Sequence, residues 1–479
     1  MKVLFIEPPS STSTSMLPPI SLPTLKGFIK TKTTHNAKIL DLLFHGKDWQ
    51  QRVLEEIKKE KPDLIGFSML SFNYQAILGI ARFIKQHSTI PIIAGGVHVI
   101  LSPQEVLSNQ EIDIVCIGEG EYVLKELLDN SLNRSGVDGI WYKEKGEIMK
   151  NKPRQLITDL DELAFPDFDD FDIQKCLFIY NNHLSIMASR GCPYSCSYCN
   201  NHALRRTLKG TYVRFRSVEN VIEEIDVRIT QYYDKGFRYF YFFDDTFILN
   251  KDYVLKFCKQ FKEKGFHKLL RWNVNIRANL VTDELMKALK DAGCYQVRMG
   301  IESGNEFIRN TIYHRGMANQ EIYDAVDIIK KNNLQLRLYF MVGAPQETIE
   351  MMHESLRMAQ SLNADEIFFG VLYPLPGTDI RKLCEDEHVL ETKNGSGFSE
   401  IAAIKKTKYV SSAQIRRFLR QVQRWQMRQY IQVGLELRGP LFILDCLRFI
   451  FLYKRKYHFE MDQLFRWNVQ RYTLAQIWN

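Results

Sequence analysis

Short apolar segments alternate with helical segments through the first third of the chain. Five apolar runs predict strands, at residues 2–7, 36–41, 64–68, 91–96 and 114–118. Segments such as 53–57 and 77–83 carry apolar residues at helical spacing. Strands that alternate with helices are typical of a parallel sheet covered on both faces. We therefore expect a doubly wound, Rossmann-like domain over residues 1–150, with ligands beyond the carboxyl ends of its strands.

A second series of six strand-then-helix units follows. Its predicted strands are 184–188, 237–243, 271–276, 295–299, 335–342 and 366–372. Six such units indicate a partial (β/α)6 barrel over 181–380, with its site at the carboxyl ends of the strands. The acidic, proline-marked segment 151–180 is expected to be a linker. The fold class is therefore α/β, completed by a helical region over 381–479.

Charge is distributed unevenly along the 479 residues. The net charge is +8, but residues 401–479 contain 15 Lys and Arg against 4 Asp and Glu, and the remainder contains 49 against 52. This basic region could contact phosphates of nucleic acid or of anionic lipid, or could simply be solvated. The apolar stretch 440–453 is broken by Asp445 and Arg448 and is shorter than the ~20 residues of a membrane span. An interfacial helix and a helix packed on the barrel remain alternatives.

Nine cysteines are present, of which three are tightly grouped. Cys192, Cys196 and Cys199 form a C-x3-C-x2-C pattern directly after the predicted strand 184–188. Three thiolates on one compact loop suit an iron–sulfur cluster. A structural zinc site normally needs four ligands, and no second close cysteine pair follows. The scattered remaining cysteines indicate a reducing cytoplasm, and the apolar run at the N-terminus is too short for a signal peptide.

The cysteine pattern, with Tyr198 just before the last cysteine, resembles the radical S-adenosylmethionine (SAM) enzymes. The resemblance implies that the three cysteines hold a 4Fe–4S cluster whose fourth iron binds SAM. It also implies cleavage of SAM to a 5′-deoxyadenosyl radical after reduction by a protein such as flavodoxin or ferredoxin. The corresponding positions of this family assign Tyr198, Asp244, Asp245, Arg277 and Glu302 to the SAM pocket.

Three glycine-containing turns of the N-terminal third are similar to the cobalamin-binding domain of one radical SAM class. They are 66–68, 94–98 and 117–121, and they place Ser68, Gly95, Gly96, Glu119 and Gly120 at the expected cobalamin site. The Asp-x-His-x-x-Gly motif of many cobalamin domains is missing after Glu7. His45 and His98 are expected to be ordinary histidines and not cobalt ligands. The missing motif leaves the alternative that the N-terminal domain is a vestigial scaffold that binds no cobalamin.

The resemblance favours a cobalamin-dependent radical SAM methyltransferase that acts at an unactivated carbon through the deoxyadenosyl radical and methylcobalamin. A radical SAM oxidative cyclase or rearrangement enzyme, with the N-terminal domain as scaffold, is the alternative. A nucleic-acid-binding protein that uses the basic C-terminal face is a third reading, which the acidic balance of the remainder opposes. We expect a small-molecule or lipid-like substrate, no nucleic acid, and a cytoplasmic location that leaves peripheral membrane contact open.

Overall fold

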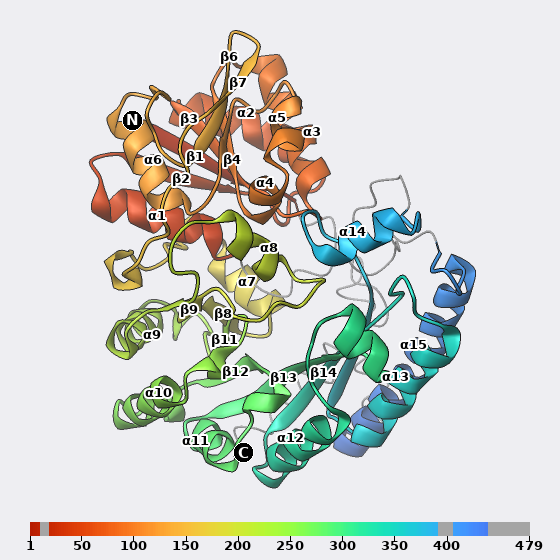
Figure 1. Ribbon diagram of the computed structural model, residues 1–479. Helices are drawn as coiled ribbons and strands as arrows, with labels where there is room; N and C mark the ends of the chain where they lie inside the picture. Colours follow the sequence, from red (N-terminus) through yellow and green to blue (C-terminus); the bar gives the residue numbers. More distant parts are fainter. Residues whose placement is uncertain (10–18, 391–405, 439–479) are drawn as a thin grey trace.

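The computed structural model describes residues 1–9, 19–390 and 406–438. Two sheets dominate it, one above the other in Figure 1. The predicted interfacial stretch 440–453 lies outside the described residues. Within them, no helix combines the length and apolar character needed to cross a membrane.

The N-terminal sheet has the strand order β2-β1-β3-β4-β5-β6-β7. Its strands are β1 (Lys2–Glu7), β2 (Asn36–Asp41), β3 (Leu64–Ser68), β4 (Ile92–Gly95), β5 (Ile114–Cys116), β6 (Ile140–Glu144) and β7 (Glu147–Lys150). The first five pair in parallel, as predicted. The antiparallel hairpin β6–β7 was not predicted, because β7 is mostly exposed and shows no apolar run.

Helices cover both faces of this sheet. They are α1 (Ser21–Lys32), α2 (Trp49–Glu60), α3 (Tyr74–His87), α4 (Val97–Leu101), α5 (Pro103–Ser108) and α6 (Gly120–Asp129). Val3 and Phe5 of β1 share one apolar cluster with α1 and α6, whereas Leu4 and Ile6 share the other with α2 and α3. Successive side chains of a strand point to opposite faces, so a continuous apolar run is buried on both sides. The doubly wound prediction is confirmed.

The second sheet is a six-stranded, wholly parallel partial barrel in the order β15-β14-β13-β12-β11-β8. Its strands are β8 (His183–Ile186), β11 (Tyr239–Phe242), β12 (Arg271–Ile276), β13 (Cys294–Glu302), β14 (Gln335–Val342) and β15 (Glu366–Val371). The helices outside it are α9 (Val218–Tyr232), α10 (Lys251–Glu263), α11 (Asp283–Asp291), α12 (Asn319–Lys331) and α13 (Ile349–Leu362). The partial barrel is confirmed. Strand β13 runs three residues beyond the predicted 295–299, so Glu302 ends the strand.

Aromatic side chains fill the layer between the barrel strands and their helices. Trp272 stacks on Phe240 at 6.0 Å between ring centroids and meets Phe257 of α10 edge-on at 5.4 Å. Burial of such side chains contributes roughly 1.5–3 kcal/mol each. The segment 237–243 is therefore a buried barrel strand, as expected, although Phe243 just after it is 52% exposed.

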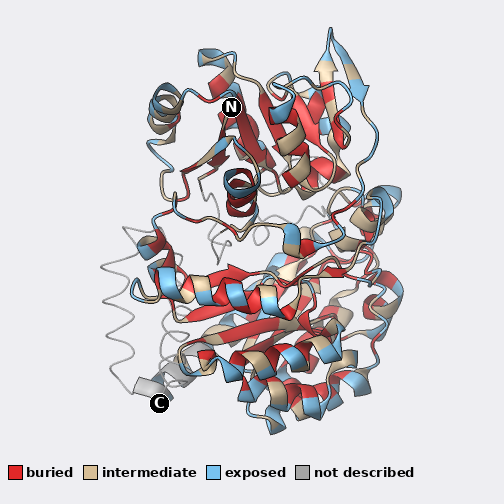
Figure 2. Ribbon diagram, turned by 90° about the vertical axis from the view of Figure 1, so that its left-hand side faces the viewer, coloured by how far each residue is buried: buried red, intermediate tan, exposed pale blue. Residues whose placement is uncertain are grey.

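The segment between the sheets is a packed element. It contains the 3-10 turn Leu160–Glu162 and α7 (Ile173–Ile179), and its Phe168 is fully buried. The ammonium of Lys26 in α1 lies 3.0 Å from a carboxylate oxygen of Asp167 and 2.8 Å from one of Asp170. This segment joins both sheets into one continuous apolar cluster. Figure 2 shows the buried interior of both layers.

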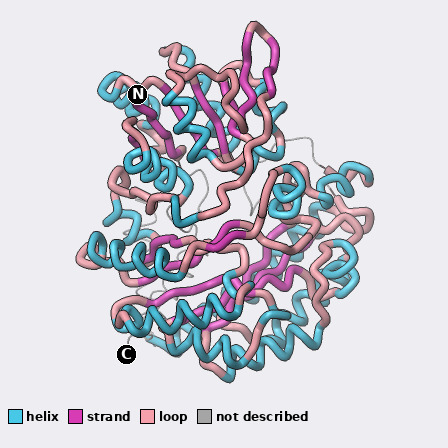
Figure 3. Tube along the Cα trace, turned by 60° about the vertical axis from the view of Figure 1, so that its left-hand side comes forward, coloured by secondary structure: helices cyan, strands magenta, loops and turns pink. Residues whose placement is uncertain are grey.

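Three further pieces frame the barrel. Helix α15 (Ser412–Arg438) confirms the helical spacing predicted at 415–422; its Phe418 meets Phe369 of β15 at 6.2 Å. Helix α14 (Asp379–Asp386) follows β15, and α8 (Asn200–Thr207) follows the cysteine loop. The short strands β9 (Ser189–Arg190) and β10 (Arg214–Phe215) pair antiparallel beside that loop. Figure 3 shows the helices and loops that connect the strands of the two sheets.

Candidate active site

The three predicted cluster cysteines lie on one loop between β9 and α8. Gly191 begins this loop with φ +88°, and a Cβ there would collide with the Tyr212 carbonyl. The middle of the loop is anchored by Ser197, whose amide donates to the Tyr313 carbonyl at 3.1 Å and whose hydroxyl donates to the Ile312 carbonyl at 2.5 Å. The loop is therefore held by fixed backbone contacts on both sides.

The thiols share one partly desolvated space. Cys192 and Cys196 are 8% and 6% exposed, and Cys199 is half-buried. Burial raises the pKa of Cys192, and it raises the pKa of Cys199 to about 12. The negative charges of Asp245 and Cys196 add to the rise in both pKa values. Ionising them needs compensating positive charge, which an iron–sulfur cluster supplies.

Two arginines face the central cysteine. Nη1 of Arg277 lies 3.9 Å from the Cys196 sulfur, and Nη1 of Arg315 lies 3.8 Å from it. The predicted Arg277 also stacks on Tyr194, with its guanidinium carbon 3.9 Å from the ring centroid. Sequence reasoning missed Arg315, because it follows a short helix in a connection and no pattern separates it from a surface arginine. Only the fold brings it to the thiols.

Glu302 and Tyr198 meet at Arg315. The guanidinium donates to the Tyr198 hydroxyl at 3.1 Å and to the Gly300 carbonyl. Glu302 has φ +71°, and its carboxylate occupies the space that a side chain at position 300 would need. Burial raises the pKa of Glu302, while Arg315 and Tyr198 oppose that rise. Tyr198, Arg277 and Glu302 thus lie around the arginines at the cysteine loop.

The paired aspartates have different surroundings. Asp244 is buried and accepts hydrogen bonds from the Ala188 amide at 3.0 Å and from the Ser189 hydroxyl. Burial raises the pKa of Asp244 to about 6. Its oxygens are occupied in holding the chain that leads into the cysteine loop. Asp245 is the more exposed of the two, and its carboxylate accepts a hydrogen bond from the side chain of Asn201. Its negative charge contributes to the raised pKa values of Cys192 and Cys199.

The predicted cobalamin residues separate into two groups. Ser68 and Gly95 pair across the carboxyl ends of β3 and β4. Gly96 follows with φ +95°, and a Cβ there would lie 2.6 Å from the Met69 carbonyl oxygen. Glu119 and Gly120 begin α6 instead. The Glu119 carboxylate accepts from Arg190 at 2.7 Å and from Arg214 at 2.9 Å, both in the barrel half of the chain.

The two histidines differ in their environment. His45 lies at the surface, 3.2 Å from Asp48. His98 is 4% exposed, with Nδ1 at 3.1 Å from the Ser71 hydroxyl. Its Nε2 has no hydrogen-bond partner among the described residues. Burial lowers the pKa of His98, which favours the neutral imidazole. An orphaned polar atom beside the β4 glycines fits a domain that receives a polar ligand there.

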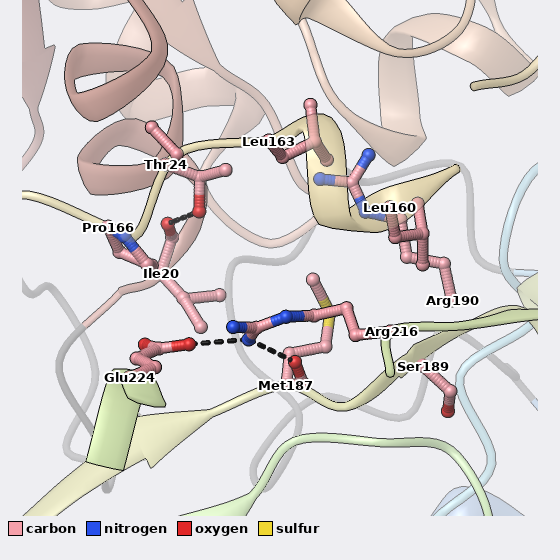
Figure 4. Close-up of a pocket in the computed structure, with 11 residues that line it drawn as sticks. Ile20, Thr24, Leu160, Leu163, Pro166, Met187, Ser189, Arg190, Arg216 and Glu224 are labelled. Atoms are coloured by element: carbon pink, nitrogen blue, oxygen red, sulfur yellow. Dashed lines mark hydrogen bonds and ion pairs between the residues drawn. The ribbon is translucent and has the colours of Figure 1, made fainter. Parts of the chain in front are cut away.

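A small pocket lies beside the site, between α1, the connecting segment and β9 (Figure 4). Ser189 and Arg190 line it, and Arg216 crosses it to reach Glu224 and the Met187 carbonyl. None of the predicted site residues lines this pocket. It is a packing feature of the boundary between the two halves.

Known families match both halves of the chain. The radical SAM superfamily model matches residues 186–359, and the B12 binding domain model matches residues 10–128. An uncharacterised methyltransferase of Pyrococcus horikoshii is 30% identical over 430 residues, which cover 88% of this chain and 91% of the relative. The chain belongs to the B12-binding radical SAM family. A further relative in this family is the anaerobic magnesium-protoporphyrin IX monomethyl ester cyclase of Rubrivivax gelatinosus, 26% identical over 79% of this chain and 69% of the relative.

Solved structures of radical SAM proteins share the fold. The methyltransferase TsrM of Kitasatospora setae aligns with a TM-score of 0.66 and 17% identity over 82% of this chain and 76% of that chain. The cobalamin-dependent SAM radical enzyme OxsB aligns with a TM-score of 0.70 and 15% identity, over 99% of this chain and 79% of that chain. The α/β architecture predicted from the sequence, a Rossmann-like domain followed by a partial barrel, is therefore confirmed.

The radical SAM domain implies a 4Fe–4S cluster and SAM as cofactors, and the B12 binding domain implies cobalamin. The residues fit these groups: the central of the three thiols faces two guanidiniums, and the glycine turn with an orphaned imidazole nitrogen lies in the B12 domain. Within the described part of the chain, no three His, Cys, Asp or Glu side chains form a group that could hold a metal ion. A cluster spans more space than a single ion, so the separated thiols suit a cluster better than zinc.

Proposed function

We propose that this radical SAM enzyme is a methyltransferase that acts at an unactivated carbon of a small molecule. The observation that carries the proposal is the cysteine loop with two arginines at its central thiol, joined directly to the B12-binding domain by the Arg190–Glu119 ion pair. The methyltransferase name of the Pyrococcus horikoshii relative, of which the alignment covers 91%, supports the same reaction.

The cofactors supply hydrogen abstraction and a transferable methyl group, and the chain supplies their positions. Cys192, Cys196 and Cys199 hold the cluster in this proposal. Arg277 and Asp245 offer opposite charges to the carboxylate and the ammonium of SAM. Glu302, kept in place by Arg315, offers acceptor oxygens for ribose hydroxyls.

The same proposal assigns cobalamin contacts to the N-terminal half. Ser68, Gly95 and Gly96 would line its site at the strand ends, where glycine permits close backbone approach. Glu119 and Gly120 lie at the boundary with the barrel. Because Glu119 is occupied by two arginines, its contribution is to hold the B12 domain against the cysteine loop. A small-molecule or lipid-like substrate and a flavodoxin- or ferredoxin-like reductant complete the proposal.

Oxidative cyclisation is the second candidate, because the Rubrivivax gelatinosus relative carries that activity in its name. The two reactions differ in their SAM-derived products. Methyl transfer produces S-adenosylhomocysteine as well as 5′-deoxyadenosine, whereas cyclisation with the N-terminal domain as scaffold produces 5′-deoxyadenosine alone. The ratio of these products therefore separates the candidates without knowledge of the substrate.

The test begins with anaerobic purification from cells supplied with cobalamin, followed by reconstitution with iron and sulfide. Cobalamin and iron are measured per chain, and both SAM products are quantified after addition of a reductant. We expect near-stoichiometric cobalamin, both products in the wild type, and loss of iron and of 5′-deoxyadenosine in Cys196→Ala. Cys258→Ala, a buried cysteine of α10 away from the loop, is the matched control. A cluster protein without cobalamin or S-adenosylhomocysteine would rule out methyl transfer.

A further inference from the structure

The inner face of the partial barrel is polar and accessible, unlike its outer face. We use the name inner face for Asn275, Arg298, Gly300, Arg337, Tyr339, Met341, Glu366 and Phe368. Phe368 is 37% exposed and the others are partly exposed, whereas their neighbours along each strand, such as Leu338 and Phe340, are buried against the helices. The interior of a complete barrel is a packed core. An accessible interior here leaves room for a bound molecule.

One row of the inner face is charged. The strand register places Asn275 beside Arg298, Arg298 beside Arg337, and Arg337 beside Glu366. Glu366 is occupied on both oxygens, by an ion pair with Arg337 and by the Gln296 amide at 3.0 Å. This row thus contains one carboxylate, that of Glu366, and two guanidiniums, those of Arg298 and Arg337. The row has an excess of one positive charge.

That excess charge belongs to Arg298. Its Nε donates to the Gln296 side-chain oxygen at 3.3 Å, and its guanidinium lies over the Tyr241 ring at 4.4 Å from the centroid. In the described ranges, Arg298 has no carboxylate oxygen within 4.0 Å, although its charge, after that of Arg337, helps to lower the pKa of Glu366. A half-buried guanidinium without a carboxylate partner is a strong binding group for an anion, because its forked donors match carboxylate and phosphoryl oxygens.

Aromatic side chains surround this guanidinium on the same face. Tyr339 and Phe368 occupy the next row toward the cysteine loop, beside Gly300, and their rings meet at 5.9 Å. Phe368 lies on the edge strand β15 and is 37% exposed. Exposed aromatic rings inside a barrel provide contact area for a planar or apolar body. The charged guanidinium of Arg298 and the aromatic rings of Tyr339 and Phe368 therefore lie in adjacent rows of the inner face.

The position of this group relates it to the proposed reaction. Arg298 precedes Gly300 by two residues on β13, which is ~7 Å of strand, and both face inward. The Gly300 carbonyl accepts from Arg315, which contacts Cys196. A molecule anchored at Arg298 would thus extend along the aromatic row toward the cluster site.

From this arrangement, and resting on the proposed function, we propose that the substrate carries a carboxylate or phosphoryl group bound by Arg298 and a planar or apolar body held by Tyr339 and Phe368. Arg298 is then the specificity-determining residue of the inner face. The described part of this face offers no second unpaired cation for the same group.

The test uses the reconstituted holoenzyme and three small probes that share a phenyl ring. Phenylacetate and phenyl phosphate carry an anion, and phenylacetamide is neutral. Dissociation constants are measured by ligand-observed NMR titration. We expect at least one anion to bind the wild type more tightly than the amide, and to bind at least ten-fold more weakly to Arg298→Gln. The stronger anion identifies the carboxylate or the phosphoryl group.

Two further variants make the result decisive. Arg298→Lys keeps the charge and should retain part of the anion binding, while Arg357→Gln, an exposed arginine of α13, should match the wild type. Equal anion binding by wild type and Arg298→Gln would overturn the proposal, as would failure of both anions to bind the wild type. Iron and cobalamin content show that each variant has folded. SAM cleavage by the wild type tests the proposed function separately. A failure of the proposed function can therefore be distinguished from a failure of anion binding at Arg298.

Discussion

Arg190, two residues before the first cysteine of the cluster loop, donates to Glu119 at the start of α6 at 2.7 Å. Its other terminal nitrogen donates to Glu121 of the same helix at 2.6 Å. The B12-binding half is therefore tied to the segment that carries the cluster cysteines. Arg214 strengthens the tie with a second ion pair to Glu119 at 2.9 Å.

Replacing Glu119 should destabilise the whole chain. Its side chain is 12% exposed and that of Arg214 is 6% exposed, so Glu119→Gln leaves a buried cation without its partner. The expected loss in the free energy of unfolding is about 3 kcal/mol, measured by urea denaturation. Glu126→Gln removes a more exposed ion pair with Arg154 and should cost at most about 1 kcal/mol. Equal effects of the two variants would contradict the buried tie.

The buried carboxyl group of Glu347 should make the stability of the protein depend on pH. Burial raises the pKa of Glu347 to about 8, although the amides of Gly343 and Ala344 donate to its carboxylate. Between the ordinary value of 4.5 and about 8, the folded state therefore binds more protons than the unfolded state. Stability should fall as the pH rises through this window, by about 1.4 kcal/mol for each unit of pKa difference.

Glu347→Gln tests this pH dependence, because the amide keeps an acceptor for both backbone donors and does not titrate. Urea denaturation of the holoenzyme between pH 5 and about pH 8 should give a flatter profile in the variant than in the wild type. Glu350→Gln, at an exposed position of α13, should leave the wild-type slope in place. If the stability of Glu347→Gln still falls with rising pH as steeply as that of the wild type, the pH dependence comes from other groups.

Gly96→Ala should weaken the B12-binding half. The new Cβ would lie 2.6 Å from the Met69 carbonyl oxygen, at φ +95°. We expect a loss of roughly 1–3 kcal/mol in unfolding free energy and a lower cobalamin content per chain. Gly79→Ala is the matched control, since its Cβ meets nothing within 4 Å in the interior of α3. That control should gain roughly 0.5–1 kcal/mol.

Arg315→Gln should lower the reduction potential of the bound cluster. The guanidinium lies 3.8 Å from the Cys196 sulfur, and positive charge near a cluster thiolate stabilises the reduced form. We expect a shift of tens of millivolts, followed by electron paramagnetic resonance during a redox titration. Iron content should remain near that of the wild type, because the three thiols are unchanged. An unaltered potential would show that this arginine does not act on the cluster.

Much of the site could be read from local sequence. The C-x3-C-x2-C loop, Arg277 after β12 and Glu302 at the end of β13 all occupy places that follow from strand position alone. Parallel strands bring their carboxyl ends to one edge, so residues just past those ends converge. Arg315 could not be found in this way, because it follows the π-helix Phe307–Ile312 and reaches Cys196 only through the folded connection.

The sequence by itself determined the parallel strands of both sheets, helical segments between them and the cysteine loop, because apolar periodicity and cysteine spacing are local properties of the chain. The tertiary structure decided which charges meet. Glu119 stands 71 residues before Arg190, and no local pattern pairs them. Likewise, Arg298 lacks a carboxylate partner in the described structure because the strand register gives Glu366 to Arg337. Such pairings depend on how separate elements pack, and only the packed fold specifies them.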